Sequence, residues 1–252
     1  MNNSEAYRDK LELSEVKLGI VCPMANERST AIEFVNAVLE RCRNFRSVKF
    51  FAVFDNSCTD GTSDLLKDQM EKISQLKVIW APNNKCVVDA YIGGYREAIE
   101  AGCDWILEID AGFSHQPSEI PQFFDKMAQG YDCVFGSRFS KGGKFESAPL
   151  SRFLLSRAGS TISNILLGTK YKDMTSGFEL FTNDTLRKVL QKGIRSRGHF
   201  FQTEIKAYCR NMRIVEVPIH YRVPSKNVNS TVIVDAFINL FLLFGKRIAG
   251  KL

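Results

Sequence analysis

The first half of the chain alternates between short apolar runs and longer amphipathic segments. The apolar runs are rich in β-branched and aromatic residues, as buried strands are, and they span 16–22, 48–54, 77–80, 105–109 and 133–135. Between them, apolar residues recur with helical spacing in 32–42, 65–73, 88–99 and 120–127. This alternation predicts a three-layer, Rossmann-like α/β fold with a mostly parallel central sheet. A ligand site is expected beyond the carboxyl ends of its strands.

The pattern changes after residue 140. A loop with glycine and serine covers 140–147, and helices are expected at 150–167 and 200–212, a strand at 214–219 and an apolar helix from Val232. No internal repeat interrupts the chain. We therefore expect a polar N-terminal segment at 1–14, one domain over 15–230 and a C-terminal apolar and basic helix at 231–252.

Composition narrows the classes of protein. The 252 residues are 44% hydrophobic and 25% charged, which excludes disordered and fibrous chains. The net charge of +6 suits anionic small molecules or an anionic membrane, and no clustered basic stripe points to nucleic acid. Seven cysteines without a C-x-x-C pair predict reduced thiols, and the polar N-terminus lacks the features of a signal peptide. A cytoplasmic protein is expected, which meets a membrane, if at all, from one side.

Polar residues follow several predicted strands at their carboxyl ends. The clusters are Pro23, Asn26 and Glu27; Asp55, Asn56 and Asp60; and Asp110. Because these ends converge on one edge of a parallel sheet, they predict a ligand crevice. Turn and helix-cap chemistry is the alternative, favoured for residues 60–62, whereas a functional role is favoured for Asp55 and Asp110. Segment 22–27 contains no glycine, which excludes a dinucleotide-binding turn or a P-loop there.

Several segments, in order, are similar to motifs of one known family. Segment 21–27 resembles P-x-x-N-E, 54–62 resembles V-D-D-G-S-T-D-G-T, 110–117 resembles D-A-D-L-Q/S-H-x-P, 135–138 resembles G-S-R-Y, 173–178 resembles D-x-T-S-G-F, and 202–204 resembles Q-x-E. From Gly19 to about Phe244 the chain thus resembles family 2 glycosyltransferases, most closely the dolichyl- or polyprenyl-phosphate mannose synthases. The resemblance implies the nucleotide-sugar-binding GT-A fold and a catalytic domain over 15–230.

The resemblance also implies which residues hold a nucleotide diphosphate sugar. The donor-binding candidates are Pro23, Asn26, Glu27, Asp55, Lys85 and Asp110. Asp110 is further the candidate ligand of Mg²⁺ or Mn²⁺, although the family's second aspartate is Gly112 here. Since Mg²⁺ is often held by one or two carboxylates plus phosphates and waters, a weakened metal site and a metal-independent site both stay open.

An acceptor that carries a phosphate would meet arginines. Arginine forks match phosphate oxygens in geometry, and the acceptor-binding candidates are Arg138, Arg152, Ser156, Arg157 and Arg222. Asp110, Arg138 and Arg152 are the catalytic candidates, while an ordinary surface role is equally favoured for Arg157. A phosphate acceptor is already mostly ionised at neutral pH, so it needs no general base.

The resemblance therefore implies an inverting glycosyltransferase. Its donor would be of the GDP-mannose or UDP-glucose type and its acceptor polyprenyl or dolichyl phosphate at the cytosolic face of a membrane. One alternative is transfer to a saccharide hydroxyl, for which Asp173 is the candidate base. Another is a non-catalytic nucleotide-sugar-binding homologue, suggested by Gly112 and by Glu179, where the family has arginine.

The last helix allows two interpretations. Asp235 and Asn239 form a narrow polar stripe, the rest of the circumference is apolar, and the basic residues Lys246, Arg247 and Lys251 follow. Contact with a membrane surface or a membrane-protein partner is favoured over packing on the domain. The aromatic residues Phe237, Phe241 and Phe244 are nevertheless expected in the core.

Overall fold

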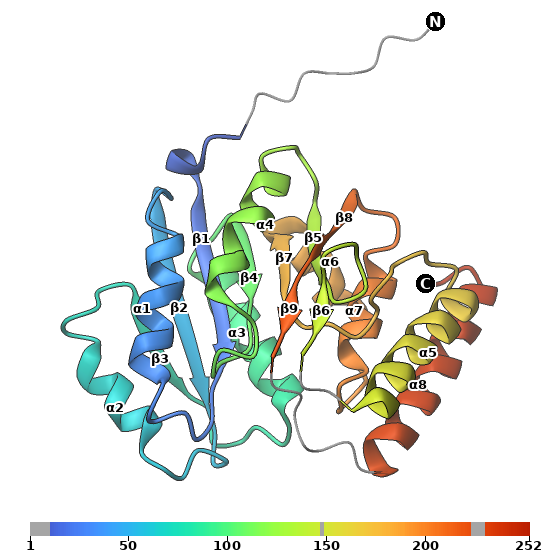
Figure 1. Cartoon of the computed structure of the whole chain (residues 1–252), viewed down its shortest axis with the longest axis horizontal. Helices are drawn as coiled ribbons and strands as arrows, with labels where there is room; N and C mark the ends of the chain where they lie inside the picture. The colour runs from blue at the N-terminus through green and yellow to red at the C-terminus, as the bar shows by residue number, and fades with distance from the viewer. Residues whose placement is uncertain (1–10, 147–148, 223–229) are drawn as a thin grey trace, which may run out of the picture.

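A seven-stranded sheet forms the centre of the molecule. In the computed structural model, which describes residues 11–146, 149–222 and 230–252, the strand order is β3-β2-β1-β4-β7-β5-β8 (Figure 1). The strands are β1 Lys17–Pro23, β2 Ser47–Phe54, β3 Leu76–Trp80, β4 Trp105–Glu108, β5 Cys133–Ser137, β7 Glu179–Thr182 and β8 Ile214–Pro218. Neighbours pair in parallel except at β7, which is antiparallel to both β4 and β5. The prediction of a mostly parallel central sheet is confirmed.

Helices cover both faces of this sheet. They are α1 Ala31–Arg41, α2 Thr62–Gln69, α3 Val87–Glu100, α4 Ile120–Met127, α5 Leu150–Leu167, α6 Asn183–Lys192, α7 Phe201–Tyr208 and α8 Ser230–Ile248. One core holds the buried side chains of α1, α2 and α4. The other holds those of α3, α6 and α7, so the three-layer arrangement is as predicted.

Strand β7 and helix α6 have no counterpart in the sequence-based prediction. β7 spans four residues and begins with the buried Glu179, so no apolar run marks it. A short parallel ladder, β6 Lys144–Phe145 with β9 His220–Tyr221, also carries no signal of its own. The antiparallel direction of β7 has a consequence for the site, because the loop before Glu179 reaches the same edge of the sheet as the carboxyl ends of β4 and β5.

Helix α3 approaches the sheet closely at Gly94. A Cβ atom there would lie 2.4 Å from Cγ1 of Val21 in β1, so only glycine allows this contact. The close approach places Tyr91, one turn earlier on α3, beside Asp110, which follows β4.

Helix α8 packs beside α5 (Figure 1). The polar stripe of α8 faces the rest of the protein, since Asp235 bonds the loop at 196–198 and Asn239 is buried. Asp235 accepts hydrogen bonds from Ser196 Oγ (2.5 Å) and the 197 and 198 backbone, and Leu240 and Leu243 are buried. The expectation of a core position is therefore wrong for Phe237 and Phe241, which are 53% and 60% exposed, whereas Phe244 is half-buried.

The basic residues at the end of α8 also contact the protein. Arg247 Nη1 donates to the backbone oxygens of Ile165 (2.9 Å) and Leu166 (2.7 Å) at the end of α5, and Lys246 Nζ contacts Tyr208 Oη at 2.9 Å. None of the helices in the described ranges is both long and apolar enough to cross a bilayer.

Candidate active site

A cleft of about 870 Å³ opens beyond the carboxyl ends of β1, β4 and β5. Three kinds of residue line it. The carboxylates of Glu27 and Asp110 follow β1 and β4, Arg138 follows β5, and α5 and α8 contribute Arg152, Ser156 and apolar side chains, among them Leu155, Ile162, Ile233 and Phe237. The cleft thus joins acidic, cationic and apolar surfaces.

A smaller pocket of about 280 Å³ adjoins the acidic part of the cleft. Asp55, Asn56 and Lys85 line it, and Pro23 lines both cavities. Most of the donor-binding candidates therefore lie together, with Asp55 and Lys85 in the smaller pocket and Glu27 and Asp110 in the cleft.

Asn26 is placed differently from the other donor-binding candidates. Its Oδ1 accepts hydrogen bonds from the backbone nitrogens of Thr59 (2.8 Å) and Asp60 (3.2 Å), and its Nδ2 donates to Ser57 O at 3.0 Å. Asn26 adopts φ +59°, a left-handed conformation that asparagine tolerates better than most residues. In this structure it fastens the loop after β2 and lines neither cavity.

Asp110 is held from two sides. Tyr91 Oη donates a hydrogen bond to Asp110 Oδ1. The backbone N–H of Asp110 donates to Nδ1 of His115 at 3.3 Å. His115 is buried and stacks on Phe178, and burial lowers its pKa to about 4, so the ring is neutral at physiological pH. His115 therefore supports the loop after β4, while Asp110 keeps 39% of its side chain exposed.

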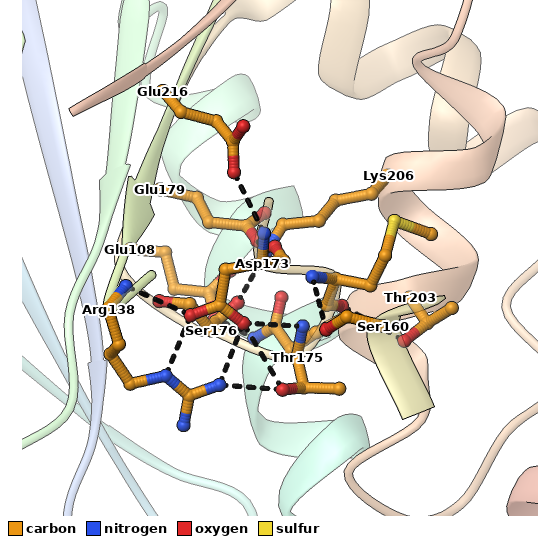
Figure 2. Close-up of polar contacts among 12 residues, drawn as sticks. Glu108, Arg138, Ser160, Asp173, Thr175, Ser176, Glu179, Thr203, Lys206 and Glu216 are labelled. Carbon is orange, nitrogen blue, oxygen red and sulfur yellow. Dashed lines mark hydrogen bonds and ion pairs between the residues drawn. The ribbon is translucent and has the colours of Figure 1, made fainter. Parts of the chain in front are cut away.

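Arg138 lines the cleft and forms a buried, bidentate ion pair. Its Nε donates to Asp173 Oδ2 at 2.7 Å and its Nη2 to Asp173 Oδ1 at 2.8 Å (Figure 2). Nη2 also donates to Thr175 Oγ1 at 2.6 Å, whereas Nη1 has no hydrogen-bond partner among the described residues. Arg138 therefore has one nitrogen left for a ligand in the cleft.

The loop that carries Asp173 is pinned by side chains from three elements (Figure 2). Glu216 of β8 accepts from the Asp173 backbone N–H at 2.9 Å, and Ser160 of α5 accepts from the Met174 N–H at 3.1 Å. Lys206 of α7 is fully buried and donates to the backbone oxygens of Asp173 and Ser176, both at 2.9 Å. The position of Arg138 thus depends on a preassembled polar framework.

Two buried carboxyl groups lie beneath this framework. Glu108 of β4 and Glu179 of β7 are directly opposite in the antiparallel register. Gln202 and Tyr95 donate to Glu108, and Lys206 pairs with Glu179 at 3.0 Å. Gln202 and Lys206 are one turn apart on α7, so this helix contacts both carboxyls. Glu108 therefore points into the core, and Lys206 compensates for the charge of Glu179, where the family has arginine.

Only some of the other acceptor candidates line the cleft. Arg152 and Ser156 line the cleft, and Ser156 Oγ accepts from Arg138 Nη2 at 3.2 Å. Arg157 is exposed, with its guanidinium 5.2 Å from the ring centroid of Phe139. Arg222 pairs with Glu146 at 3.5 Å, and its backbone N–H donates to Ser114 O, a residue of the cleft. Arg157 and Arg222 are thus not brought to the cleft wall in this structure.

The structure contradicts the choice of Asp173 as a general base. Burial alone would raise the pKa of this carboxyl, but the Arg138 guanidinium outweighs burial and holds the pKa far below its ordinary value. Both oxygens of Asp173 also accept from Arg138. A carboxylate so paired is a poor proton acceptor.

Sequence reasoning missed several residues of the site. Tyr91 was only a position in the expected helix 88–99 and Thr175 only part of a motif, although they bond Asp110 and Arg138. Lys206 carried no signal, because a lysine on a helix is by default exposed. The spacing of Gln202 and Lys206 gains meaning only when β4 and β7 place two carboxyls beneath it.

The residues in the cleft can hold a divalent metal ion that takes only two ligands from the protein. No cluster of three or more histidine, cysteine or acidic side chains occurs within the described ranges. Asp110 and Glu27 both face the cleft, and two carboxylates with substrate phosphates and waters are a common arrangement for Mg²⁺.

Comparison with known proteins identifies the family. The sequence model described as glycosyl transferase family 2 matches residues 19–190. The chain belongs to glycosyl transferase family 2. It is 34% identical over 203 residues to undecaprenyl-phosphate mannosyltransferase of Micrococcus luteus. The matched region covers 80% of this chain and 82% of that protein. It is 28% identical over 205 residues to polyprenol monophosphomannose synthase of Mycolicibacterium smegmatis, covering 80% and 76%. This family 2 chain is accordingly a glycosyltransferase.

Solved structures support the same fold. Glucosyl-3-phosphoglycerate synthase of Mycobacterium tuberculosis, in complex with Mn²⁺, uridine diphosphate and phosphoglyceric acid, superposes with a TM-score of 0.66 at 14% identity. The match covers 91% of this chain and 79% of that one. The GT-A fold expected from the sequence is thereby confirmed.

The buried carboxyl pair predicts a pH dependence of stability. Burial and then the charge of Glu179 raise the pKa of Glu108 well above its ordinary 4.5. A carboxyl with a raised folded-state pKa stabilises the fold below its unfolded pKa and loses this contribution as pH rises through the folded value. The free energy of unfolding should therefore decrease with pH above about 4.5, by up to about 1.4 kcal/mol per pH unit for each proton.

Glu108→Gln removes one of these titrations with little change in shape. We expect a shallower decrease and higher stability at neutral pH than in the wild type, measured by urea denaturation from about pH 5 to pH 9. Glu71→Gln, an exposed control, should keep the wild-type slope. A slope in Glu108→Gln equal to that of the wild type would rule out Glu108 as a source of the pH dependence.

Proposed function

We propose that this glycosyltransferase transfers a hexosyl group, with inversion, from a nucleotide diphosphate sugar to a polyprenyl phosphate. The observation that carries the proposal is that one cleft is lined by the carboxylates of Glu27 and Asp110, by Arg138, which bonds Ser156 of α5, and by apolar residues of α5 and α8. A cation-bound diphosphate, an acceptor phosphate and a hydrocarbon chain would each find a matching surface there. The names of the two curated relatives favour mannose as the sugar.

The donor would occupy the smaller pocket and the acidic part of the cleft. Asp55 and Lys85 would contact the nucleoside and its first phosphate, since they line the smaller pocket. Pro23 lines both cavities and would lie where the nucleotide passes from one to the other. The anomeric carbon would then lie near Asp110 and Arg138.

Arg138 would hold the acceptor phosphate through Nη1. A phosphate oxygen attacks the anomeric carbon from the face opposite the diphosphate, a carbon–oxygen bond forms, and the bond to the diphosphate breaks with its electron pair. The acceptor is already ionised, so no proton has to be removed. This agrees with a cleft in which the candidate base Asp173 is paired with arginine.

A divalent cation, Mg²⁺ or Mn²⁺, would be held at Asp110. When bound, it would neutralise charge on the departing diphosphate. Arg152, which also lines the cleft, would add a second positive charge.

The two alternatives are less well supported. Transfer to a saccharide hydroxyl needs a base, and the pairing of Asp173 removes the candidate chosen for it. A non-catalytic homologue was suggested by Glu179 and Gly112, but Lys206 accounts for Glu179 as part of the framework behind Arg138.

A transfer assay with matched acceptors tests the proposal. The wild type with GDP-mannose or UDP-glucose and a short polyprenyl phosphate should form a polyprenyl phosphosugar, detected by mass spectrometry. The corresponding polyprenol, which lacks the phosphate, should give no product because it lacks both the charge for Arg138 and an ionised nucleophile. Transfer to polyprenol or a saccharide at comparable rate would favour the hydroxyl alternative, and no single-turnover product with any acceptor would favour the non-catalytic one.

We further propose that the enzyme acts peripherally at a membrane surface, through the exposed apolar side chains of α5 and α8. These side chains are Leu150, Phe153, Leu154, Leu155, Ile162 and Ile165 of α5, and Ile233, Val234, Phe237, Ile238, Phe241, Leu242 and Ile248 of α8. Large contiguous apolar surfaces of this kind mark contact sites. The surface continues into the cleft through Leu155 and Phe237, so a lipid-linked acceptor could enter directly from the bilayer.

The double variant Ile238→Gln/Phe241→Gln tests this location without changing the cleft lining. Since burial of one large apolar side chain is worth about 1.5–3 kcal/mol, the partition coefficient onto vesicles with anionic lipid should fall at least about tenfold, as measured by flotation at several lipid concentrations. Met70→Gln/Trp80→Gln, which changes exposed apolar residues elsewhere, should bind as the wild type does. Equal flotation of both double variants would contradict the proposed contact.

A further inference from the structure

Position 112 lies beside Asp110 but has no side chain, and the structure shows what fills its place. A Cβ atom at Gly112 would lie 2.7 Å from both carboxylate oxygens of Glu27. Gly112 has φ +69°, so its backbone is left-handed as well. The Glu27 carboxylate therefore occupies the space in which a side chain of residue 112 would begin.

Glu27 reaches this position from another strand. It follows β1, and its backbone N–H donates to Thr62 Oγ1 at 2.9 Å, which fixes the turn. Thr30 Oγ1 donates to Oε2 at 3.1 Å, whereas Oε1 accepts no hydrogen bond from the described residues. The half-buried carboxylate thus lines the cleft with one oxygen available, against Gly112 and so two residues along the chain from Asp110, and it does not line the pocket of Asp55 and Lys85.

We infer that Glu27 and Asp110 together form the divalent-cation site, with Glu27 in the role that an acidic residue at position 112 would otherwise take. This inference rests on the proposed function, since the cation would bind with the donor diphosphate. Two carboxylates from different strands satisfy the oxygen preference of Mg²⁺ or Mn²⁺, and phosphates and waters complete the coordination. Glu27 would then act on the diphosphate and not on the nucleoside.

A measurement of Mn²⁺ binding tests the assignment independently of activity. Free aqueous Mn²⁺ is counted by electron paramagnetic resonance in the presence of GDP or UDP. Glu27→Ala and the isosteric Glu27→Gln should each weaken Mn²⁺ binding at least about tenfold, because loss of even an indirect partner of a metal site costs about 10–100-fold. Glu33→Gln, an exposed glutamate on α1, should bind Mn²⁺ as the wild type does.

A second-site variant separates loss of a ligand from general damage. In Glu27→Ala/Gly112→Asp the obstructing carboxylate is gone, and a new one enters from position 112, where aspartate tolerates a positive φ better than most residues. The double variant should regain most of the lost Mn²⁺ affinity, whereas Gly112→Asp alone should not improve on the wild type. All variants should melt cooperatively, as checked by circular dichroism.

The outcomes distinguish this inference from the proposed function. Wild-type Mn²⁺ affinity in both Glu27 variants would overturn the inference. Nucleotide binding and sugar transfer by the wild type in the presence of a chelator would also overturn the inference, but they would support the proposed function. A wild type that binds neither nucleotide nor Mn²⁺ would overturn both.

Discussion

The buried ion pair between Arg138 and Asp173 is the interaction on which the geometry of the cleft depends. Removing two charges from water is costly, and such a pair persists only with near-ideal geometry and further hydrogen bonds. The bidentate contacts at 2.7 and 2.8 Å, with Thr175 and Ser156 beside them, meet that requirement. The arginine is therefore held in place before any ligand arrives, with one nitrogen left over.

The polar residues in the core support the loop that carries Asp173. Lys206 joins the Asp173 loop to Glu179 on β7, and Gln202 joins the same helix to Glu108 on β4. Since β7 is antiparallel, its preceding loop comes to the edge of the sheet where the parallel strands deliver their functional residues. One reversed strand thus brings a supporting framework to an otherwise parallel site.

Much of the fold and part of the site could be predicted from the sequence. Buried parallel strands and amphipathic helices leave strong periodic patterns, and helix α5 has the predicted bounds at Leu150–Leu167. Residues directly after strands, such as Asp55, Asp110 and Arg138, could be placed at one edge because topology alone brings them there.

The remaining features depend on tertiary partners that a single sequence does not display. Strand β7 was missed because Glu179 interrupts its apolar pattern, and the charge is tolerated only beside Lys206. On α8, periodicity identified the polar stripe but not its direction, which the bonds of Asp235 to the loop at 196–198 decide. The relation of Glu27 to Gly112 joins residues 85 positions apart and has no local signature.

The most direct test of this account is the steady-state kinetics of Arg138→Lys with polyprenyl phosphate as the varied substrate. Lysine keeps the charge beside Asp173 but cannot serve that carboxylate and an acceptor phosphate together. The account predicts that kcat/KM for the acceptor falls at least about 100-fold, as for loss of one preorganised donor, while the melting shift produced by nucleotide is unchanged. A loss of nucleotide binding with an unchanged dependence on acceptor concentration would contradict the account.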